Sequence, residues 1–186
     1  MKLRNILLNM LSLTGLASCV SQNSCPIETS TTKIKYSEHS NSGLGISTTF
    51  EIYEDSLVWS LREPRYSRKL SDVLNCDKQD FQELVTALSA IRFSARDAHD
   101  HSAGGSGWGV SFENQKGVYF YYNDSFKLSG DYERVTEQIL GYVEKHKPEG
   151  LKRYEQLCSE PHERGMYGEF DELPEALKPY QNNFRN

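Results

Sequence analysis

Hydrophobic and polar residues alternate along two pairs of segments, a pattern typical of strands that bury one face of a sheet. The first pair covers residues 45–53 and 56–62 and is joined by a short connection at residues 54–55. The second pair lies on either side of residues 114–117, a sequence with Asn and Gly that favours a tight turn. The pattern therefore predicts two antiparallel hairpins. The residues expected on their buried faces are Ile46, Thr48, Phe50, Ile52, Leu57, Trp59, Leu61, Trp108, Val110, Phe112, Val118, Phe120 and Tyr122.

Two further segments repeat their hydrophobic residues every three or four positions, which predicts amphipathic helices. The first helix follows Asp77, a suitable N-cap because its carboxylate accepts hydrogen bonds from the free N–H groups of the first turn. Its apolar stripe consists of Phe81, Leu84, Val85, Leu88 and Ile91. The second helix begins at Asp131 and stops before Pro148, and its inward residues are Tyr132, Val135, Ile139, Tyr142 and Val143.

Weaker patterns predict three additional elements. Residues 33–36 are expected to form a short edge strand, and residues 65–70 an extra short strand. Residues 149–158 are expected to form a short helix. The remaining residues are expected to form an extended C-terminal tail that docks on the domain through Tyr167, Phe170, Leu177 and Phe184.

The main elements follow the order ββαββα, which predicts an α+β domain with two layers. In this arrangement an antiparallel sheet carries both helices on one face, because each apolar helix stripe needs a surface against which to pack. The predicted organisation is a leader at residues 1–18, a flexible tether at 19–32, the α+β domain at 33–148 and a helical or extended tail at 149–186.

The first residues predict export and lipidation. Lys2 and Arg4 precede a short apolar run, as in a secretory leader. The sequence Leu-Ala-Ser-Cys that ends at Cys19 closely resembles the lipobox of bacterial lipoproteins. The resemblance implies cleavage before Cys19, diacylglycerol on its sulfur and a membrane anchor, to which each buried CH₂ contributes about 0.8 kcal/mol. Val20 stands where inner-membrane lipoproteins of enterobacteria-like hosts carry aspartate, which favours the outer membrane, facing the periplasm.

Charge and cysteine content refine this picture. Loss of the leader removes Lys2 and Arg4 and changes the formal net charge from −5 to −7. An acidic domain has no electrostatic reason to bind nucleic acid, so the expected membrane attachment comes from the lipid alone. Cys25, Cys76 and Cys158 remain after lipidation, and this odd number permits one disulfide without selecting the pair.

One loop offers candidate metal ligands. In an extended backbone, Asp97, His99 and His101 point to the same side. Two imidazoles and a carboxylate form a ligand set that zinc takes in open sites. This gives the hypothesis of a zinc-binding lipoprotein, against an ordinary solvated loop that requires no cofactor.

The glycine-rich stretch at residues 104–109 fits neither a nucleophile elbow nor a dinucleotide loop, because it runs into a strand instead of a helix. It is interpreted as a connection that lets Trp108 pack under a helix. With no catalytic group evident, the chain is predicted not to be an enzyme.

The sheet face opposite the helices suggests binding. Tyrosine is enriched at protein interfaces because its ring is large, stiff and amphipathic. Tyr53, Arg62, Tyr119 and Tyr121 are expected to form a binding patch for an envelope protein, as in an inhibitor or immunity-type factor. The mature pattern also resembles small bacterial envelope lipoproteins, which supports the location and implies no activity.

Overall fold

The computed structural model describes residues 25–39, 45–93, 107–124, 131–160, 170 and 172–182. The strands in these ranges are β1 (Cys25–Pro26), β2 (Lys33–His39), β3 (Ser47–Tyr53), β4 (Ser56–Glu63), β5 (Arg68–Asn75), β6 (Arg92–Phe93), β7 (Gly107–Asn114) and β8 (Gly117–Asp124). The helices are α1 (Lys78–Ser89), α2 (Asp131–Lys145) and α3 (Glu149–Ser159), with 3-10 helices η1 (Pro64–Tyr66) and η2 (Glu175–Tyr180). The α+β class predicted from the sequence is confirmed.

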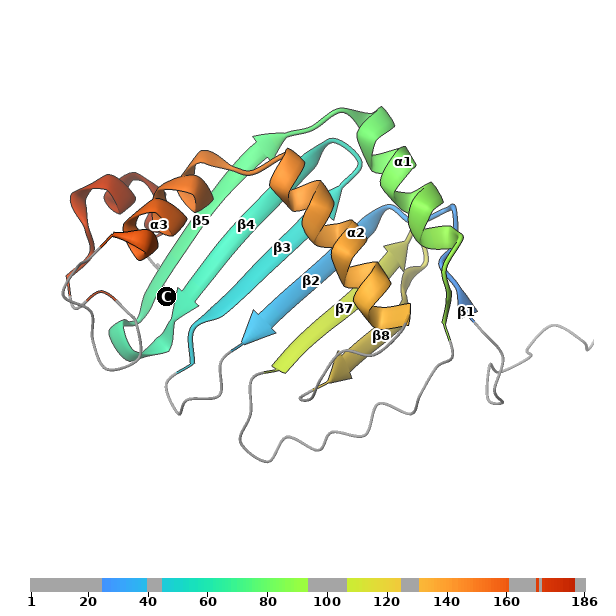
Figure 1. Ribbon diagram of the computed structural model, residues 1–186, viewed down its shortest axis with the longest axis horizontal. Coiled ribbons are helices and arrows are strands. Elements are labelled where there is room, and N and C mark those ends of the chain that lie inside the picture. Colours follow the sequence, from blue (N-terminus) through green and yellow to red (C-terminus); the bar gives the residue numbers. More distant parts are fainter. Residues whose placement is uncertain are drawn as a thin grey trace, which may run out of the picture.

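Six strands form one antiparallel sheet in the order β5-β4-β3-β2-β7-β8 (Figure 1). Both predicted hairpins are present, but the ββαββα order omits β2 and β5. The expected edge position of the strand at residues 33–36 is wrong, because β2 is longer and lies in the middle of the sheet. Ile34 and Tyr36 are fully buried there, and they bridge the cores of the two hairpins.

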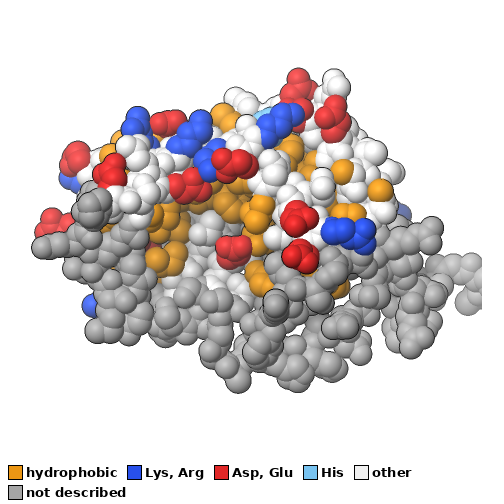
Figure 2. Space-filling view, in the orientation of Figure 1, with side chains coloured by type: hydrophobic (Ala, Val, Ile, Leu, Met, Phe, Trp, Pro, Cys, Tyr) orange, Lys and Arg blue, Asp and Glu red, His pale blue; other side chains and the backbone are white. Residues whose placement is uncertain are grey.

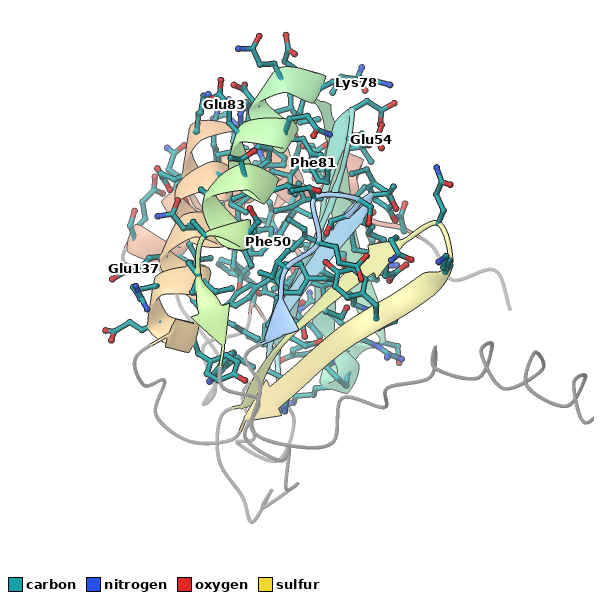
Figure 3. The ribbon with its side chains drawn as sticks, turned by 90° about the vertical axis from the view of Figure 1, so that its right-hand side faces the viewer. Phe50, Glu54, Lys78, Phe81, Glu83 and Glu137 are labelled. Atoms are coloured by element: carbon teal, nitrogen blue, oxygen red, sulfur yellow. The ribbon has the colours of Figure 1, made fainter. Side chains whose placement is uncertain are left out.

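Helices α1 and α2 cross the same face of the sheet (Figure 1). Asp77 caps α1 as predicted, since its side chain accepts a hydrogen bond from the Gln79 N–H at 2.8 Å. Phe50 of the sheet and Phe81 of α1 lie in the space between sheet and helices, whereas Glu83 and Glu137 point away from it (Figure 3). The predicted apolar stripes of both helices are buried in this core.

Strand β7 carries the glycine-rich segment into the sheet. Trp108 is buried and its ring lies 6.2 Å from that of Tyr132 on α2, which confirms that it packs under a helix. A Cβ atom at Gly107 would clash with the imidazole of His39, directly across from it on β2. Glycine at this position therefore lets the histidine ring lie across the strand.

A β-bulge in the hairpin of β7 and β8 changes which side chains face the core. Phe112 pairs with Phe120, but Glu113 pairs with Val118, so Tyr119 is the extra residue. Val118 is consequently 58% exposed, and Tyr119 packs against the hydrophobic core. The simple alternation expected for this strand, with Val118 inside and Tyr119 outside, is wrong because the bulge shifts the register by one residue.

The C-terminal elements cover the β5 side of the sheet. Asp72 of β5 accepts a hydrogen bond at 2.8 Å from the Gly150 N–H in the first turn of α3. Gln181 bridges to Leu70, and the Asn182 N–H donates to the Lys69 carbonyl at 2.9 Å, so the segment after η2 pairs with an edge that would otherwise be open. Phe170 and Leu177 are buried as predicted, while Tyr167 and Phe184 lie outside the described residues.

Several predicted features fall outside the described residues. These are Cys19 with the whole leader, and Asp97, His99 and His101 of the candidate metal loop. In the part of the chain that the structure describes, no helix is sufficiently long and apolar to cross a membrane. Mixed positive and negative side chains are visible over the helix side of the molecule (Figure 2).

Candidate functional site

The sheet face opposite α1 and α2 is made of polar rows that run across the strands. The pairing registers place Ser37, Thr49, Ser60 and Ser71 side by side on neighbouring strands. These side chains are half-buried, and they are short. The row therefore forms a flat, hydroxyl-rich band between rows of longer side chains, because directly paired residues point to the same face.

A charged cluster lies on one side of this band, around Lys33 of β2. Its ammonium group is 3.1 Å from the Glu51 carboxylate and 3.5 Å from that of Glu113, and it lies 5.3 Å from the centre of the Tyr53 ring. Burial acts to lower the pKa of Lys33, but hydrogen bonds and charges from Glu51 and Tyr53 outweigh burial and leave this pKa raised. Lys33 therefore stays charged at neutral pH and holds the two glutamates and the tyrosine together.

The predicted binding residues do not form one patch. Tyr53 and Arg62 share the open face but lie near opposite ends of their strands, where Tyr53 faces Lys33 and Arg62 faces Ser47 and Lys69. The backbone of Tyr121 pairs with Ser111, and the placement of the Tyr121 side chain lies outside the described residues. Tyr119 belongs elsewhere, because the bulge turns it toward the core. The expected grouping is thus replaced by a Lys33–Tyr53 cluster and a separate Arg62 region.

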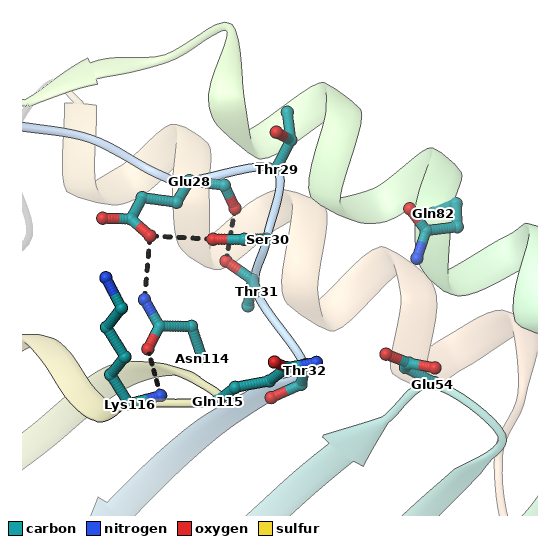
Figure 4. Close-up of a pocket in the computed structure, with 10 residues that line it drawn as sticks. All are labelled: Glu28, Thr29, Ser30, Thr31, Thr32, Glu54, Gln82, Asn114, Gln115 and Lys116. Carbon is teal, nitrogen blue, oxygen red and sulfur yellow. Dashed lines mark hydrogen bonds between the residues drawn. The ribbon is translucent and has the colours of Figure 1, made fainter.

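A polar pocket of about 420 Å³ opens at the end of the sheet where β2 begins (Figure 4). It is formed by the segment before β2, the connections that follow β3 and β7, and one side chain of α1. Its lining residues are Glu28, Thr29, Ser30, Thr31, Thr32, Glu54, Gln82, Asn114, Gln115 and Lys116. Residues 28–32, predicted to be the end of the tether, are thus part of the pocket wall.

Tyr119 connects this wall to the sheet through hydrogen bonds. Its hydroxyl accepts a hydrogen bond from the Glu28 N–H at 3.0 Å and lies 2.6 Å from Oγ1 of Thr31, which is almost completely buried. The Thr32 N–H donates to the Glu113 carbonyl at 2.8 Å. These long-range contacts explain why a segment rich in Ser and Thr has a defined conformation here.

The Glu28 carboxylate organises the pocket side chains. It accepts hydrogen bonds from the Ser30 hydroxyl and the Asn114 amide, both at 2.8 Å (Figure 4). These two bonds, with a smaller contribution from the charge of Lys116, lower the pKa of Glu28 against a small opposing effect of burial. The pocket thus presents an ionised carboxylate among hydroxyl and amide groups, an arrangement that can hold a polar ligand by hydrogen bonds.

A second polar cluster lies where β5 leads into α1. Cys76 and Cys158 are both free thiols, so these two cysteines are not bonded to each other. Burial, the largest effect, raises the pKa of Cys76 despite a hydrogen bond with Tyr142. The Asp80 carboxylate of α1 is 2.7 Å from Lys145 and 3.1 Å from His146 at the end of α2. At neutral pH Cys76 is a protonated thiol, which is a poor nucleophile.

In the described ranges, no group of three or more His, Cys, Asp or Glu side chains is placed to hold a metal ion. The predicted ligands of the 97–101 loop lie outside these ranges.

The fold and the surface together define an α+β domain whose antiparallel sheet has one helix-covered face and one polar face, with a polar pocket at the sheet end. No protein-family model matches the chain, and no curated protein or solved structure is significantly similar to it.

Proposed function

We propose that this chain is a lipid-anchored protein of the bacterial cell envelope, a two-layer domain that binds another protein on the open face of its sheet and catalyses no reaction. The observation that carries this proposal is the half-exposed cluster of Lys33, Glu51, Glu113 and Tyr53 on that face. A lysine that links two carboxylates and a tyrosine ring gives the partner a fixed polar and aromatic surface.

The ion pairs of the open face contribute little to folding, which supports a role in recognition. Exposed and half-exposed ion pairs contribute about 0–1 kcal/mol to folding, so Lys33 and its partners are not needed to hold the sheet together. The same groups contribute more once a partner excludes water from them. The stiff Tyr53 ring, which Lys33 already contacts, loses little conformational entropy on binding.

The proposed location follows from the lipobox. In this proposal Cys19 carries the lipid, and the outer membrane facing the periplasm is its destination. A Cys19→Ser substitution should shift the full chain from the membrane fraction to the soluble fraction, and mass spectrometry of the N-terminal peptide should show that the lipid is lost. A Cys19→Ser protein that stays membrane-bound would contradict the anchor.

Binding is tested by affinity capture. The full tagged chain, extracted from host envelopes with mild detergent, should retain a stoichiometric protein that a Lys33→Ala, Tyr53→Ser variant does not retain. The control variant is Lys152→Ala, Arg153→Ala, which removes two exposed cations from α3, remote from the open face. If both variants capture the same protein equally well, or if the wild type captures none, the proposed function is wrong.

The alternative function is metal binding by Asp97, His99 and His101, with zinc as the candidate ion. The capture experiment is repeated in EDTA, because a partner lost on chelation would favour this alternative. Isothermal titration with zinc tests it directly: unchanged affinity in a His99→Ala, His101→Ala variant would exclude this ligand set.

A further inference from the structure

We infer that the partner is recognised through an acidic segment that docks at a basic corner formed by Arg62, Arg65 and Lys69, where β4, η1 and β5 meet. The inference rests on the proposed role as a protein-binding module. It specifies that the partner is acidic and that the basic corner binds it. The corner is separate from the Lys33 cluster and from the polar pocket.

The corner has a charge opposite to that of the whole protein. The chain has a formal net charge of −5, yet residues 62–69 contain Arg62, Arg65, Arg68 and Lys69 with a single acidic residue. That residue, Glu63, is paired with Arg68 at 2.8 Å, and both side chains are buried. Arg62, Arg65 and Lys69 form no ion pair with any residue that the structure describes. Their charges are therefore available to a partner.

The placement of two of these cations works against folding. Arg62 on β4 and Lys69 on β5 are directly paired across the strands and point to the same open face. Like charges in this position destabilise a sheet. An anionic partner would offset this repulsion, because both Arg62 and Lys69 would attract the same negative group.

The third cation, Arg65, contacts the Tyr66 ring, which in turn contacts the buried Arg68 guanidinium. The Arg68 guanidinium is fixed by the Glu63 carboxylate and by the carbonyl of Phe170, and it lies 4.2 Å from the centre of the Tyr66 ring. The Arg65 guanidinium lies 5.4 Å from the centre of the same ring. Arg65 is thus partly preorganised, which reduces the entropy cost of binding.

Backbone geometry also fixes the corner. Pro64 begins η1 with a restricted φ, and the Ser67 N–H donates to the Pro64 carbonyl at 3.1 Å. Ser67 has a φ of 51°, a left-handed conformation that non-glycine residues rarely adopt. A connection built in this way presents Arg62, Arg65 and Lys69 in one arrangement, and planar guanidinium groups match carboxylates in paired hydrogen bonds.

The position of the corner favours a protein over the membrane surface. β1, through which the chain enters the described domain, and the connection from β4 to β5 lie on opposite sides of the molecule (Figure 1). The registers give the same result, because β2 runs from the Lys33 cluster to the row of His39, Ser47 and Arg62, about 20 Å along the strand. Under the proposed anchoring, the corner is the end remote from the lipid.

The test uses the full chain in detergent micelles and a fluorescent octaglutamate peptide, with octaglutamine as the neutral probe. Fluorescence anisotropy should show salt-sensitive binding of octaglutamate and none of octaglutamine. Arg62→Gln, Arg65→Gln, Lys69→Gln should weaken binding roughly tenfold. The matched control Lys78→Gln, Lys152→Gln, Arg153→Gln removes the same charge from exposed sites on the helices and should change affinity less than about twofold.

Thermal unfolding separates recognition from a structural role. The triple corner variant should be at least as stable as the wild type, since it removes the repulsion between Arg62 and Lys69. A single Tyr66→Leu variant, which removes the ring beneath Arg65, should weaken octaglutamate binding less than the triple variant does. A corner variant that unfolds at much lower temperature would assign these residues to folding and overturn the inference.

Two other outcomes overturn the inference while they leave the proposed function standing. One is equal loss of octaglutamate binding in the corner and control variants. The other is corner-dependent binding of phosphatidylglycerol vesicles without binding of octaglutamate, which would make the membrane the occupant. The envelope partner provides the independent check: a partner retained by the wild type and equally by the corner variant contradicts only this inference, whereas absence of any partner contradicts the proposed function.

Discussion

The two faces of the sheet are made by the same strands, yet they have opposite physical characters. The helix-covered face carries a continuous apolar layer, in which Trp59, Phe112 and Ile52 are completely buried. The other face, one residue away along each strand, carries Ser60, Lys33 and Glu51 in half-exposed rows. Apolar burial, and with it the hydrophobic contribution to stability, is thus concentrated on the helix-covered face, whereas the other face carries polar groups.

The sharpest test of this comparison uses neighbouring residues of β4. Trp59→Ala removes a fully buried ring and should destabilise the domain by about 3–5 kcal/mol, while Ser60→Ala on the opposite face should change stability by less than about 0.5 kcal/mol. Urea denaturation monitored by circular dichroism measures both effects, and similar costs for Trp59 and Ser60 would refute the division between faces.

Phe81→Asp or Leu84→Asp on α1 should unfold the domain altogether, because each places a charge in the core. Circular dichroism of either variant should show loss of the native spectrum, and a folded variant would contradict the burial of that side chain.

A second test compares the contributions of a buried and an exposed ion pair to the free energy of unfolding. Glu63→Gln leaves the Arg68 guanidinium buried without its carboxylate and should cost about 3–5 kcal/mol. Glu54→Gln breaks an exposed pair with Lys78 at 3.7 Å and should cost less than about 1 kcal/mol. Both variants are measured by chemical denaturation at neutral pH. Equal effects would show that the Glu63 pair is not shielded from solvent as the structure indicates.

A third test compares two tyrosines that the sequence pattern placed together. Tyr119→Phe removes a hydroxyl that contacts the Glu28 N–H and Thr31, and it should cost about 1–2 kcal/mol. Tyr53→Phe loses a long contact of 3.4 Å with Glu51 and the interaction of the hydroxyl with Lys33, both on the half-exposed open face, and should be nearly neutral. Hydrogen exchange should also show faster opening at residues 28–32 in the Tyr119 variant. A neutral Tyr119→Phe would mean that the pocket wall is held by other contacts.

The smallest expected effect concerns pH and the Cys76 thiol. Because burial raises its folded pKa above the usual value of 9.0, the protonated thiol stabilises the folded state fully below that pH. This stabilisation should be lost as the pH rises through the raised pKa. The difference in unfolding free energy between wild type and Cys76→Ala should therefore shrink in alkaline solution and stay constant from pH 6 to 8. A difference that grows with pH would show that the thiolate is the favoured form.

Much of the fold was predictable because local pattern and tertiary contact agree. The stripe from Phe81 to Leu88, the Asp77 cap and the two hairpins follow from periods of 3.6 and 2 residues and from turn chemistry. Trp108 was expected under a helix and lies against Tyr132. These elements bury the apolar residues that identify them, so the sequence carries the signal directly.

The central position of β2 and the packing of the C-terminal segment were less visible. β2 contributes Ile34 and Tyr36 to the core and was expected as an edge strand. Which strand pairs with which depends on contacts between residues far apart in the chain, and alternation alone does not encode the partner. Phe170 and Leu177 were identified as docking residues, but the pairing of Gln181 with Leu70 required the folded sheet.

The positions of the proposed binding residues were predicted in part. Alternation correctly placed Tyr53 and Arg62 on the open face, and it failed for Tyr119 because nothing in the local sequence marks the bulge after Val118. The pocket wall at residues 28–32 had the composition of a linker, since its order comes from Tyr119 and Asn114, more than eighty positions later. The sequence shows the run of cations at the basic corner, but only the folded structure shows that Arg68 is buried against Glu63, while Arg62, Arg65 and Lys69 form no ion pair with the residues that the structure describes.

The sequence by itself determined the two hairpins, the helices and most of their buried residues, because backbone periodicity and side-chain hydrophobicity act locally. It also shows the lipobox-like residues that end at Cys19 and the overall acidity, both of which are read directly from residue types. The tertiary structure decided strand order, the bulge, the wall of the pocket and the basic corner. The physical reason is that each of these depends on pairing between distant residues, whose free energy is gained only after the chain has closed the loops between them.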